Sequence, residues 1–239
     1  MNPNRLYSFA TAAIAAATLA VSAHADLLSG NEVQLETWLG QGDMDFTNIF
    51  TKQADDGSID FHAKVDGKGA TFTLVNAYTL NAQTGLYDIG HLLGGYNPLS
   101  WSSTVGWNMT PSNADRTAFL FNLSSSTIQR QNLIGFGATG SGEYQTYYHP
   151  LFGPLFGSGY DLYVDGALAV GFASNYSYGG TSYTTNLTGA SDFTSFHVGE
   201  IEVYTVAPAT TSVPDTAGTL GLLGISMLGL VAFRRRITS

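Results

Sequence analysis

The segment Thr117–Leu123 limits the fold most tightly, because large apolar side chains alternate along it. Successive side chains of a strand point to opposite faces, so Phe119 and Phe121 share one face and Ala118 and Leu120 the other. This alternation predicts a central strand that is buried on at least one face, with both phenylalanines pointing inward. Before it come a Gly94–Gly95 pair and Pro98. We expect these residues to form a turn, because glycine adopts positive φ at little cost.

The rest of the chain shows further strand patterns and no run of strand–helix units. We therefore expect a mainly β fold with minor α content, an antiparallel β-sandwich flanked by one or two helices. Asp66–Gly69 is expected to join two of the strands as a hairpin turn. The expected strands are Ile59–Val65, Ala70–Val75, Glu143–His149, Tyr160–Val164, Leu168–Phe172 and Phe196–Val206.

One clear helix is predicted over Leu28–Gly40. Ser29 stands where an N-cap belongs, and Glu32 would complete a capping box three residues later. Gly40 is the expected C-cap. The helix would pack on the sheet through a single apolar stripe of leucine and tryptophan side chains.

Residues 1–25 have the features of a secretory signal peptide. Arg5 precedes an alanine-rich apolar stretch, and Ala23 and Ala25 frame an A-x-A cleavage site. The mature chain is therefore expected to begin at Asp26. The exported domain would occupy 26–206, followed by a short linker at 207–212.

The C-terminal region, 213–239, has three parts. Val213, Pro214 and Asp215 form a short motif, 217–233 is apolar enough for a transmembrane helix, and a basic end follows at Arg234, Arg235 and Arg236. The arginines would remain on the cytoplasmic side. This order is similar to the PEP-CTERM sorting signal that exosortases read, in its V-P-D-S-G-like variant. A plain membrane anchor is the alternative.

Charge and cysteine content restrict the partners. The formal net charge is −9, and the terminal segments hold Arg5 and Arg234–Arg236 but only one acidic residue, so the domain is more acidic than the whole chain. Such a surface disfavours nucleic acid. The sequence has no cysteine, which excludes disulfides and thiolate chemistry.

Two blocks of the sequence resemble the TLDc domain. The first is I-G-H-L-L-G-G-Y-N-P-L-S-W with the F-L-F-N-L strand after it, and the second is F-G-S-G-Y-D-L-Y-V-D. The match spans about Leu35 to Val206 and is closest to TLDc-like domains of bacterial surface proteins that carry a PEP-CTERM tail. The resemblance implies a non-catalytic interaction module. Its motif residues, expected to be structural, are Gly94, Gly95, Trp101, Phe119, Phe121, Gly159, Asp161 and Asp165.

Other motifs are weaker. Gly135–Gly140 matches the dinucleotide fingerprint in form, but no helical pattern follows it, so a loop is expected. The histidines of the mature chain, His62, His91, His149 and His197, lack metal-ligand spacing. We therefore expect no metal and no cofactor. If the protein does bind a metal ion, the expected ion is calcium, held by loop aspartates near Asp55 and Asp56.

Carboxylates and tyrosines leave the functional alternatives open. Asp161 and Asp165 flank Tyr163 on one strand face, and Glu200 and Glu202 precede Tyr204. Paired carboxylates beside aromatic rings are typical of glycosidases, which gives a polysaccharide hydrolase as one alternative. Surface tyrosines suit sugars or proteins, which gives a carbohydrate-binding module as another. The candidate ligand surface comprises Tyr144, Tyr147, Tyr163 and Tyr178.

Taken together, the sequence predicts an exported protein of a Gram-negative-type cell envelope. It would pass through the inner membrane, be processed by an exosortase-like enzyme, and reach the outer surface or the medium. Its interaction domain would contact extracellular polysaccharide or a surface protein.

Overall fold

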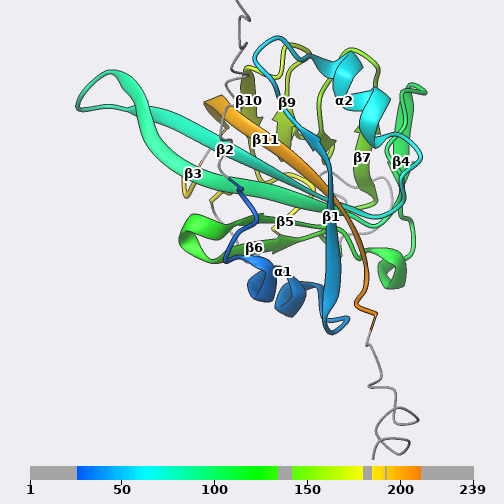
Figure 1. Ribbon diagram of the computed structural model, residues 1–239. Helices are drawn as coiled ribbons and strands as arrows, with labels where there is room; N and C mark the ends of the chain where they lie inside the picture. The colour runs from blue at the N-terminus through cyan, green and yellow to red at the C-terminus, as the bar shows by residue number, and fades with distance from the viewer. Residues whose placement is uncertain (1–25, 134–141, 180–184, 192, 211–239) are drawn as a thin grey trace, which may run out of the picture.

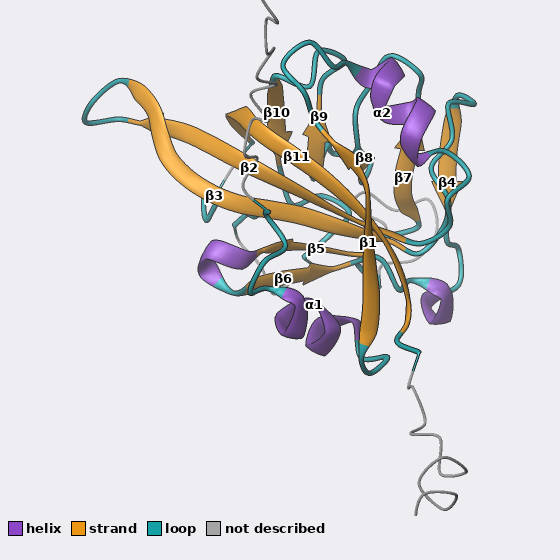
Figure 2. Cartoon of the chain, viewed as in Figure 1, coloured by secondary structure: helices purple, strands orange, loops and turns teal. Residues whose placement is uncertain are grey.

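The computed structural model describes residues 26–133, 142–179, 185–191 and 193–210. The fold is mainly β, its sheet is antiparallel, and two α-helices accompany it, as predicted (Figures 1 and 2). The helices are α1 (Glu32–Leu39) and α2 (Ser58–Val65). The strands are β1 (Met44–Thr51), β2 (Thr71–Asn81), β3 (Leu86–Asn97), β4 (Gly106–Met109), β5 (Phe119–Asn122), β6 (Thr127–Arg130), β7 (Tyr144–Tyr148), β8 (Leu155–Phe156), β9 (Leu162–Val164), β10 (Val170–Ala173) and β11 (Thr194–Pro208).

Hydrogen bonds connect these strands into one sheet of 11 strands. Its order is β4-β7-β8-β9-β10-β11-β2-β3-β5-β6, and β1 pairs with β11 beside that path. One edge of β11 pairs with β10 over its first residues and with β1 over its last, while the other edge pairs with β2. A bulge between Val198 and Glu200 separates these two parts. Because a bulge bends its strand, the sheet can fold over on itself into a sandwich-like arrangement.

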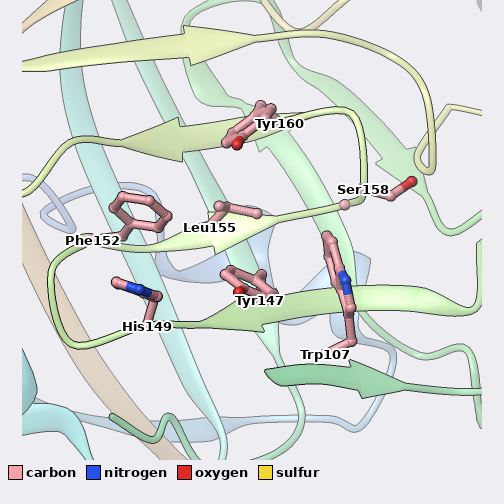
Figure 3. Close-up of a pocket in the computed structure, with 8 residues that line it drawn as sticks. Trp107, Tyr147, His149, Phe152, Leu155, Ser158 and Tyr160 are labelled. Atoms are coloured by element: carbon pink, nitrogen blue, oxygen red, sulfur yellow. The ribbon is translucent and has the colours of Figure 1, made fainter. Parts of the chain in front are cut away.

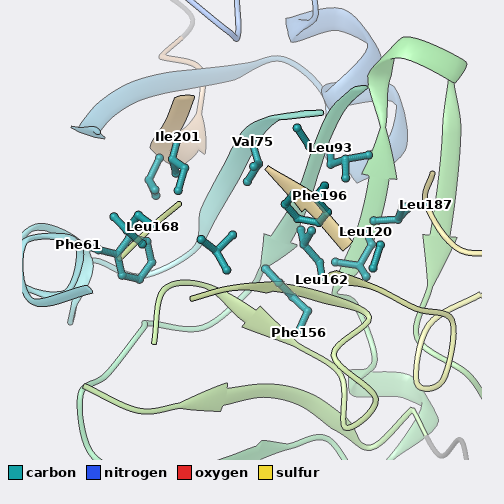
Figure 4. Close-up of a cluster of buried hydrophobic side chains, with 14 of the residues drawn as sticks. Phe61, Val75, Leu93, Leu120, Phe156, Leu162, Leu168, Leu187, Phe196 and Ile201 are labelled. Carbon is teal, nitrogen blue, oxygen red and sulfur yellow. The ribbon is translucent and has the colours of Figure 1, made fainter. Parts of the chain in front are cut away.

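The main hydrophobic core fills the space between the two layers of the folded sheet. Val75 and Leu93 reach it from β2 and β3, and Phe156 and Leu162 from β8 and β9 (Figure 4). Phe61 of α2 belongs to the same core. Burial of these apolar side chains, at about 25 cal/mol per Å², is the main source of stability in a chain without cysteine.

A second core lies on the other face of β2, β3 and β5. Phe119 and Phe121 are fully buried there, next to Phe72, and α1 covers them together with Leu27 and Leu28. The Trp38 ring of α1 lies 5.9 Å from that of Phe121. Ala118 and Leu120 face the main core instead. The predicted alternation along this strand is confirmed, and both of its faces are buried.

Helix α1 is shorter than predicted. It begins at Glu32 with Asn31 at the N-cap position, so the capping box at Ser29 is wrong. Gly30 has φ of +80°, a left-handed conformation that interrupts a helix at this point. The predicted C-cap is confirmed, since Gly40 is left-handed and its N–H donates to the Glu36 carbonyl over 2.8 Å.

The segment predicted as the strand Ile59–Val65 is helix α2, and the hairpin is therefore wrong. Phe61 and Val65, four residues apart, are both fully buried, whereas Ile59 is 71% exposed. The Asp60 carboxylate accepts the Gly57 N–H at 3.0 Å and caps the helix. The turn at Asp66–Gly69 connects this helix to β2.

The predicted turn at Gly94–Gly95 is also wrong, because both residues lie inside β3. A Cβ atom at Gly94 would come within 2.3 Å of the Phe121 ring, and one at Gly95 within 2.6 Å of the Phe156 ring. These glycines provide space for aromatic rings on both faces of the strand. Trp101 follows in the main core, where its ring N–H donates to the Thr71 hydroxyl at 3.0 Å.

The strands expected in the second half of the chain are present with small shifts at their ends. β11 continues through Pro208, two residues into the predicted linker. The expected signal peptide, sorting motif, transmembrane helix and basic end, and the loop Gly135–Gly140, lie outside the described residues. Within the described ranges, no helix is both long and apolar enough to cross a membrane.

Candidate ligand-binding face

Asp161, the first residue of the D-L-Y-V-D segment, has a structural role. It is fully buried, and its carboxylate accepts the backbone N–H groups of Tyr176 and Ser177. Burial disfavours the charged form and raises the pKa of Asp161 to about 7. The backbone N–H donors stabilise the carboxylate and lower its pKa, but by less. A carboxylate that is enclosed by backbone donors holds a loop in place and cannot reach a substrate.

Asp165 and Glu202 also make hydrogen bonds that stabilise the fold. Asp165 accepts the Ala169 N–H at 2.8 Å and so closes the turn between β9 and β10. Glu202 is 3% exposed and accepts the Leu27 N–H at 2.8 Å and the Tyr204 hydroxyl at 2.6 Å. Burial raises the pKa of Glu202 as well. One carboxylate of each predicted pair, Asp161 and Glu202, is thus buried, so neither pair forms an open acid–base site.

The histidines lie in separate environments. His62 is buried; its Nδ1 lies 2.7 Å from an Asp66 oxygen, and its Nε2 lies 3.0 Å from the His149 carbonyl. His197 stacks on Tyr87 at 3.8 Å between ring centroids. Burial lowers the pKa of His91. Across the part of the chain that the structure describes, no three His, Asp or Glu side chains form a group that could hold a metal ion.

Aromatic side chains gather on the outer face of the layer formed by β4, β7, β8, β9 and β10. Along each strand the inward positions supply the main core, so the alternate positions point away from it. Trp107 of β4 stands opposite Tyr147 of β7, and Tyr163 of β9 stands opposite Phe172 of β10. We call this set the aromatic stripe; it comprises Trp107, Tyr144, Tyr147, His149, Phe152, Tyr160, Tyr163, Phe172 and Phe193.

The rings of the aromatic stripe form a continuous series. Ring centroids of successive members, from Trp107 through Tyr147, His149, Phe152, Tyr163 and Phe172 to Phe193, lie between 4.5 and 6.2 Å apart. These are the distances of favourable aromatic contacts. The two ends are open to solvent, since Trp107 is 39% and Phe193 51% exposed. The series therefore crosses the strands from one side of the layer to the other.

A cavity of about 320 Å³ opens at the Trp107 end of the stripe. Leu155 lies between Tyr147 and Tyr160, and Trp107 stands beside them (Figure 3). Ser158 and Gly157 complete this side. Among the residues that the structure describes, no Asp, Glu, Lys or Arg lines the cavity. A concave apolar site with a few hydroxyl groups is the usual form of a small-ligand pocket.

The sequence-based ligand surface is partly assembled here. Tyr144 and Tyr147 belong to the aromatic stripe and are partly exposed, whereas Tyr163 belongs to the stripe but is buried. Tyr178 is fully buried in the main core, and the Tyr178 hydroxyl donates to the Gln145 carbonyl at 2.8 Å. Its assignment to the surface is wrong, because a bridge between Gln131 and Tyr178 draws its backbone into the sheet. Sequence reasoning missed Trp107 and Phe172. An aromatic residue between small neighbours, as in G-F-A at Phe172, was the available signal.

Comparison with known proteins identifies the family of this chain but names no ligand. The TLDc domain family matches residues 33–207. No curated protein matches the sequence. The matched range covers most of the chain and includes the described strands from β1 to β11, so the protein belongs to the TLDc domain family.

Proposed function

We propose that this protein is exported to the cell envelope and acts there as a non-catalytic interaction domain whose contact surface is the aromatic stripe. The observation that carries the proposal is the contrast between two sets of residues. The carboxylates that could act in catalysis, Asp161 and Glu202, are buried in framework hydrogen bonds. The aromatic residues, in contrast, form a continuous row on the outer face of the layer, in which Trp107, Tyr160 and Phe193 are exposed.

The extracellular matrix is the proposed partner of this surface. Exposed aromatic side chains give rigid contact area and are enriched in binding sites. The acidic charge of the chain, −9 overall, makes nucleic acid an unfavourable partner. An uncharged exopolysaccharide or another surface protein would bring no such charge conflict.

Retention in the matrix tests the contact surface. In cells that express the full-length chain, we expect Tyr147→Ala to move the protein from the sedimented matrix into the medium. Tyr87→Ala is the matched control, because Tyr87 is an aromatic residue of β3 outside the stripe. Equal retention of the two variants would overturn the proposed surface. Release of reducing sugar from purified matrix would overturn the non-catalytic assignment.

Export and sorting are a separate part of the proposal. The signal peptide would be removed before Asp26, and an exosortase-like enzyme would cleave near Val213, Pro214 and Asp215. A proline there breaks any helix extending outward from the membrane and leaves an extended peptide that a protease can reach. The intact mass of the surface or secreted form should correspond to residues 26 to about 213. Recovery only in the inner membrane, still ending at Ser239, would instead indicate a plain tail anchor.

A further inference from the structure

We infer that the aromatic stripe binds an uncharged polysaccharide chain of pyranose units, laid across the strands with one end in the Trp107 cavity. This inference rests on the proposed function and names the chemistry of its ligand. It combines the direction of the stripe, the spacing of its rings, and the charges and hydroxyl groups around them.

The direction of the stripe favours a long ligand. Neighbouring strands lie about 4.7–4.9 Å apart, so rings that stand opposite one another on adjacent strands are spaced at about that distance. The cross-strand pairs show this, with ring centroids 4.8 Å apart for Trp107 and Tyr147 and 5.8 Å apart for Tyr163 and Phe172. Between β7 and β9, where β8 adds no ring to the stripe, His149 and Phe152 of the β7–β8 connection continue the series. One aromatic ring per step is comparable to one pyranose unit of an extended chain. A compact ligand would use only one part of such a row.

The charges favour an uncharged ligand. Among the described residues that line the cavity there is no Asp, Glu, Lys or Arg, and the one acidic or basic residue of the stripe is His149. An anionic polymer would also meet the repulsion of a chain with net charge −9. Stacked bases of a nucleic acid need a cationic groove beside the rings. The aromatic stripe offers the rings without that groove.

The hydroxyl groups favour a sugar over a purely apolar ligand. Tyr147 and Tyr160, which carry hydroxyl groups, line the cavity together with the apolar Leu155. The Ser158 hydroxyl is instead paired with that of Ser177 at 3.0 Å. A pyranose ring has an apolar face of C–H groups and a rim of hydroxyls. Rings can stack on its face while the tyrosine hydroxyls exchange hydrogen bonds with its rim. A lipid chain would leave those hydroxyls without partners, which costs free energy.

Titration of the full-length protein with defined oligosaccharides tests the inference, with affinity measured by calorimetry in a detergent without sugar groups. The uncharged probes are hexasaccharides of β-1,4-, β-1,3- and α-1,4-linked glucose and the matching trisaccharides, and the charged probe is hexagalacturonate. We expect at least one uncharged hexasaccharide to bind, its trisaccharide to bind more weakly, and hexagalacturonate not to bind. Absence of binding by every uncharged hexasaccharide, or equal binding of the charged probe, would overturn the inference.

Two variants test the orientation of the ligand. Trp107→Ala should weaken both the hexasaccharide and the trisaccharide by about tenfold, since the cavity holds the chain end in each case. Phe193→Ala, at the far end of the stripe, should weaken the hexasaccharide alone. Tyr87→Ala should change neither affinity, and thermal unfolding of each variant verifies its fold. Equal effects of Phe193→Ala on both lengths would contradict a chain laid along the stripe.

The outcomes separate this inference from the proposed function. If matrix retention requires Tyr147 but no uncharged oligosaccharide binds, the stripe is a contact surface for another class of partner and only the inference fails. If retention does not require Tyr147, the proposed function itself fails. If a hexasaccharide binds but its addition does not release the protein from the matrix, the stripe is a sugar-binding site on which matrix retention does not depend.

Discussion

Gly94 and Gly95 allow aromatic rings to approach β3 from its two faces. The Phe121 ring occupies the position of a Cβ at Gly94, and the Phe156 ring occupies that of a Cβ at Gly95. Each ring belongs to a different hydrophobic core. Two adjacent residues without side chains therefore determine how closely both cores pack against this strand.

Replacing Gly94 with alanine should lower the free energy of unfolding by about 1–3 kcal/mol, the usual cost of overpacking. The added Cβ would lie 2.3 Å from both the Phe121 ring and the Thr73 carbonyl oxygen. Gly90→Ala, in the same strand, is the control, because the nearest atom there is 3.7 Å away. Urea unfolding of the two variants measures the difference. Equal stabilities would contradict the close approach at Gly94.

Asp161 should make the protein less stable as the pH rises. Its pKa is raised from 3.8 to about 7 in the folded state, so between these values the folded protein holds a proton that the unfolded chain has released. The stabilising contribution of Asp161 is then largest below about pH 4, falls as the pH rises to about 7, and is absent above that. The contribution is on the order of 4 kcal/mol.

The Asp161→Asn variant isolates this effect. It keeps a carbonyl oxygen for the backbone donors of Tyr176 and Ser177 but cannot ionise. Unfolding free energies measured at several pH values between 4 and 8 should therefore show a shallower decline than in the parent protein. Parallel pH profiles would mean that Asp161 titrates at its ordinary value. Glu202, whose pKa is also raised, accounts for part of the decline that remains.

At the scale of single elements, α2 provides the clearest test. In a helix, Ile59 and Phe61 lie on different sides, whereas a strand would place them on the same face. Phe61→Ala should cost about 3–5 kcal/mol in unfolding free energy, because Phe61 is fully buried. Ile59→Ala should be nearly neutral, since that side chain is 71% exposed. Chemical denaturation of both variants decides between the two conformations, and similar large losses would indicate a strand.

Local periodicity predicted the elements whose burial follows a simple pattern. Phe119–Asn122 and the core residues of β9 and β11 alternate in sequence, so their strands could be recognised. Helix α2 could not be recognised in this way, because its short I-D-F-H-A-K-V segment fits both periods. The deciding contacts come from distant residues, such as the Gly166 carbonyl that accepts the Ser58 N–H at 2.8 Å.

The candidate site depends even more on pairing between strands. Tyr147 was identifiable as a surface tyrosine, but its neighbour Trp107 lies across the β4–β7 register and far away in sequence. No local pattern states which strands become neighbours. The same limitation explains why Tyr178 was wrongly assigned to the surface. Its sequence neighbours are rich in glycine and serine, as in an exposed loop, but its ring is buried.

At the scale of the whole molecule, the two hydrophobic cores should be sufficient to stabilise the fold without a metal ion. We expect an excess of EDTA to leave the melting temperature of the purified full-length protein unchanged. Magnesium-saturated EDTA serves as the control for nonspecific effects of the chelator. A drop on the order of ten degrees would instead reveal a bound cation, and the loop with Asp55 and Asp56 would be the first place to look for it.

The position of β11 has a consequence for when the domain can fold. This last strand pairs with β1, β2 and β10, and one of its hydrogen bonds, from the Thr205 side chain to Thr47, joins positions 158 residues apart. A chain that emerges with its N-terminus first therefore presents β1 and β2 with open edges until nearly the whole domain has followed. Contacts between such distant positions slow folding, and open strand edges favour association with other chains. Keeping the nascent chain extended until Pro208 has emerged would protect it during this interval.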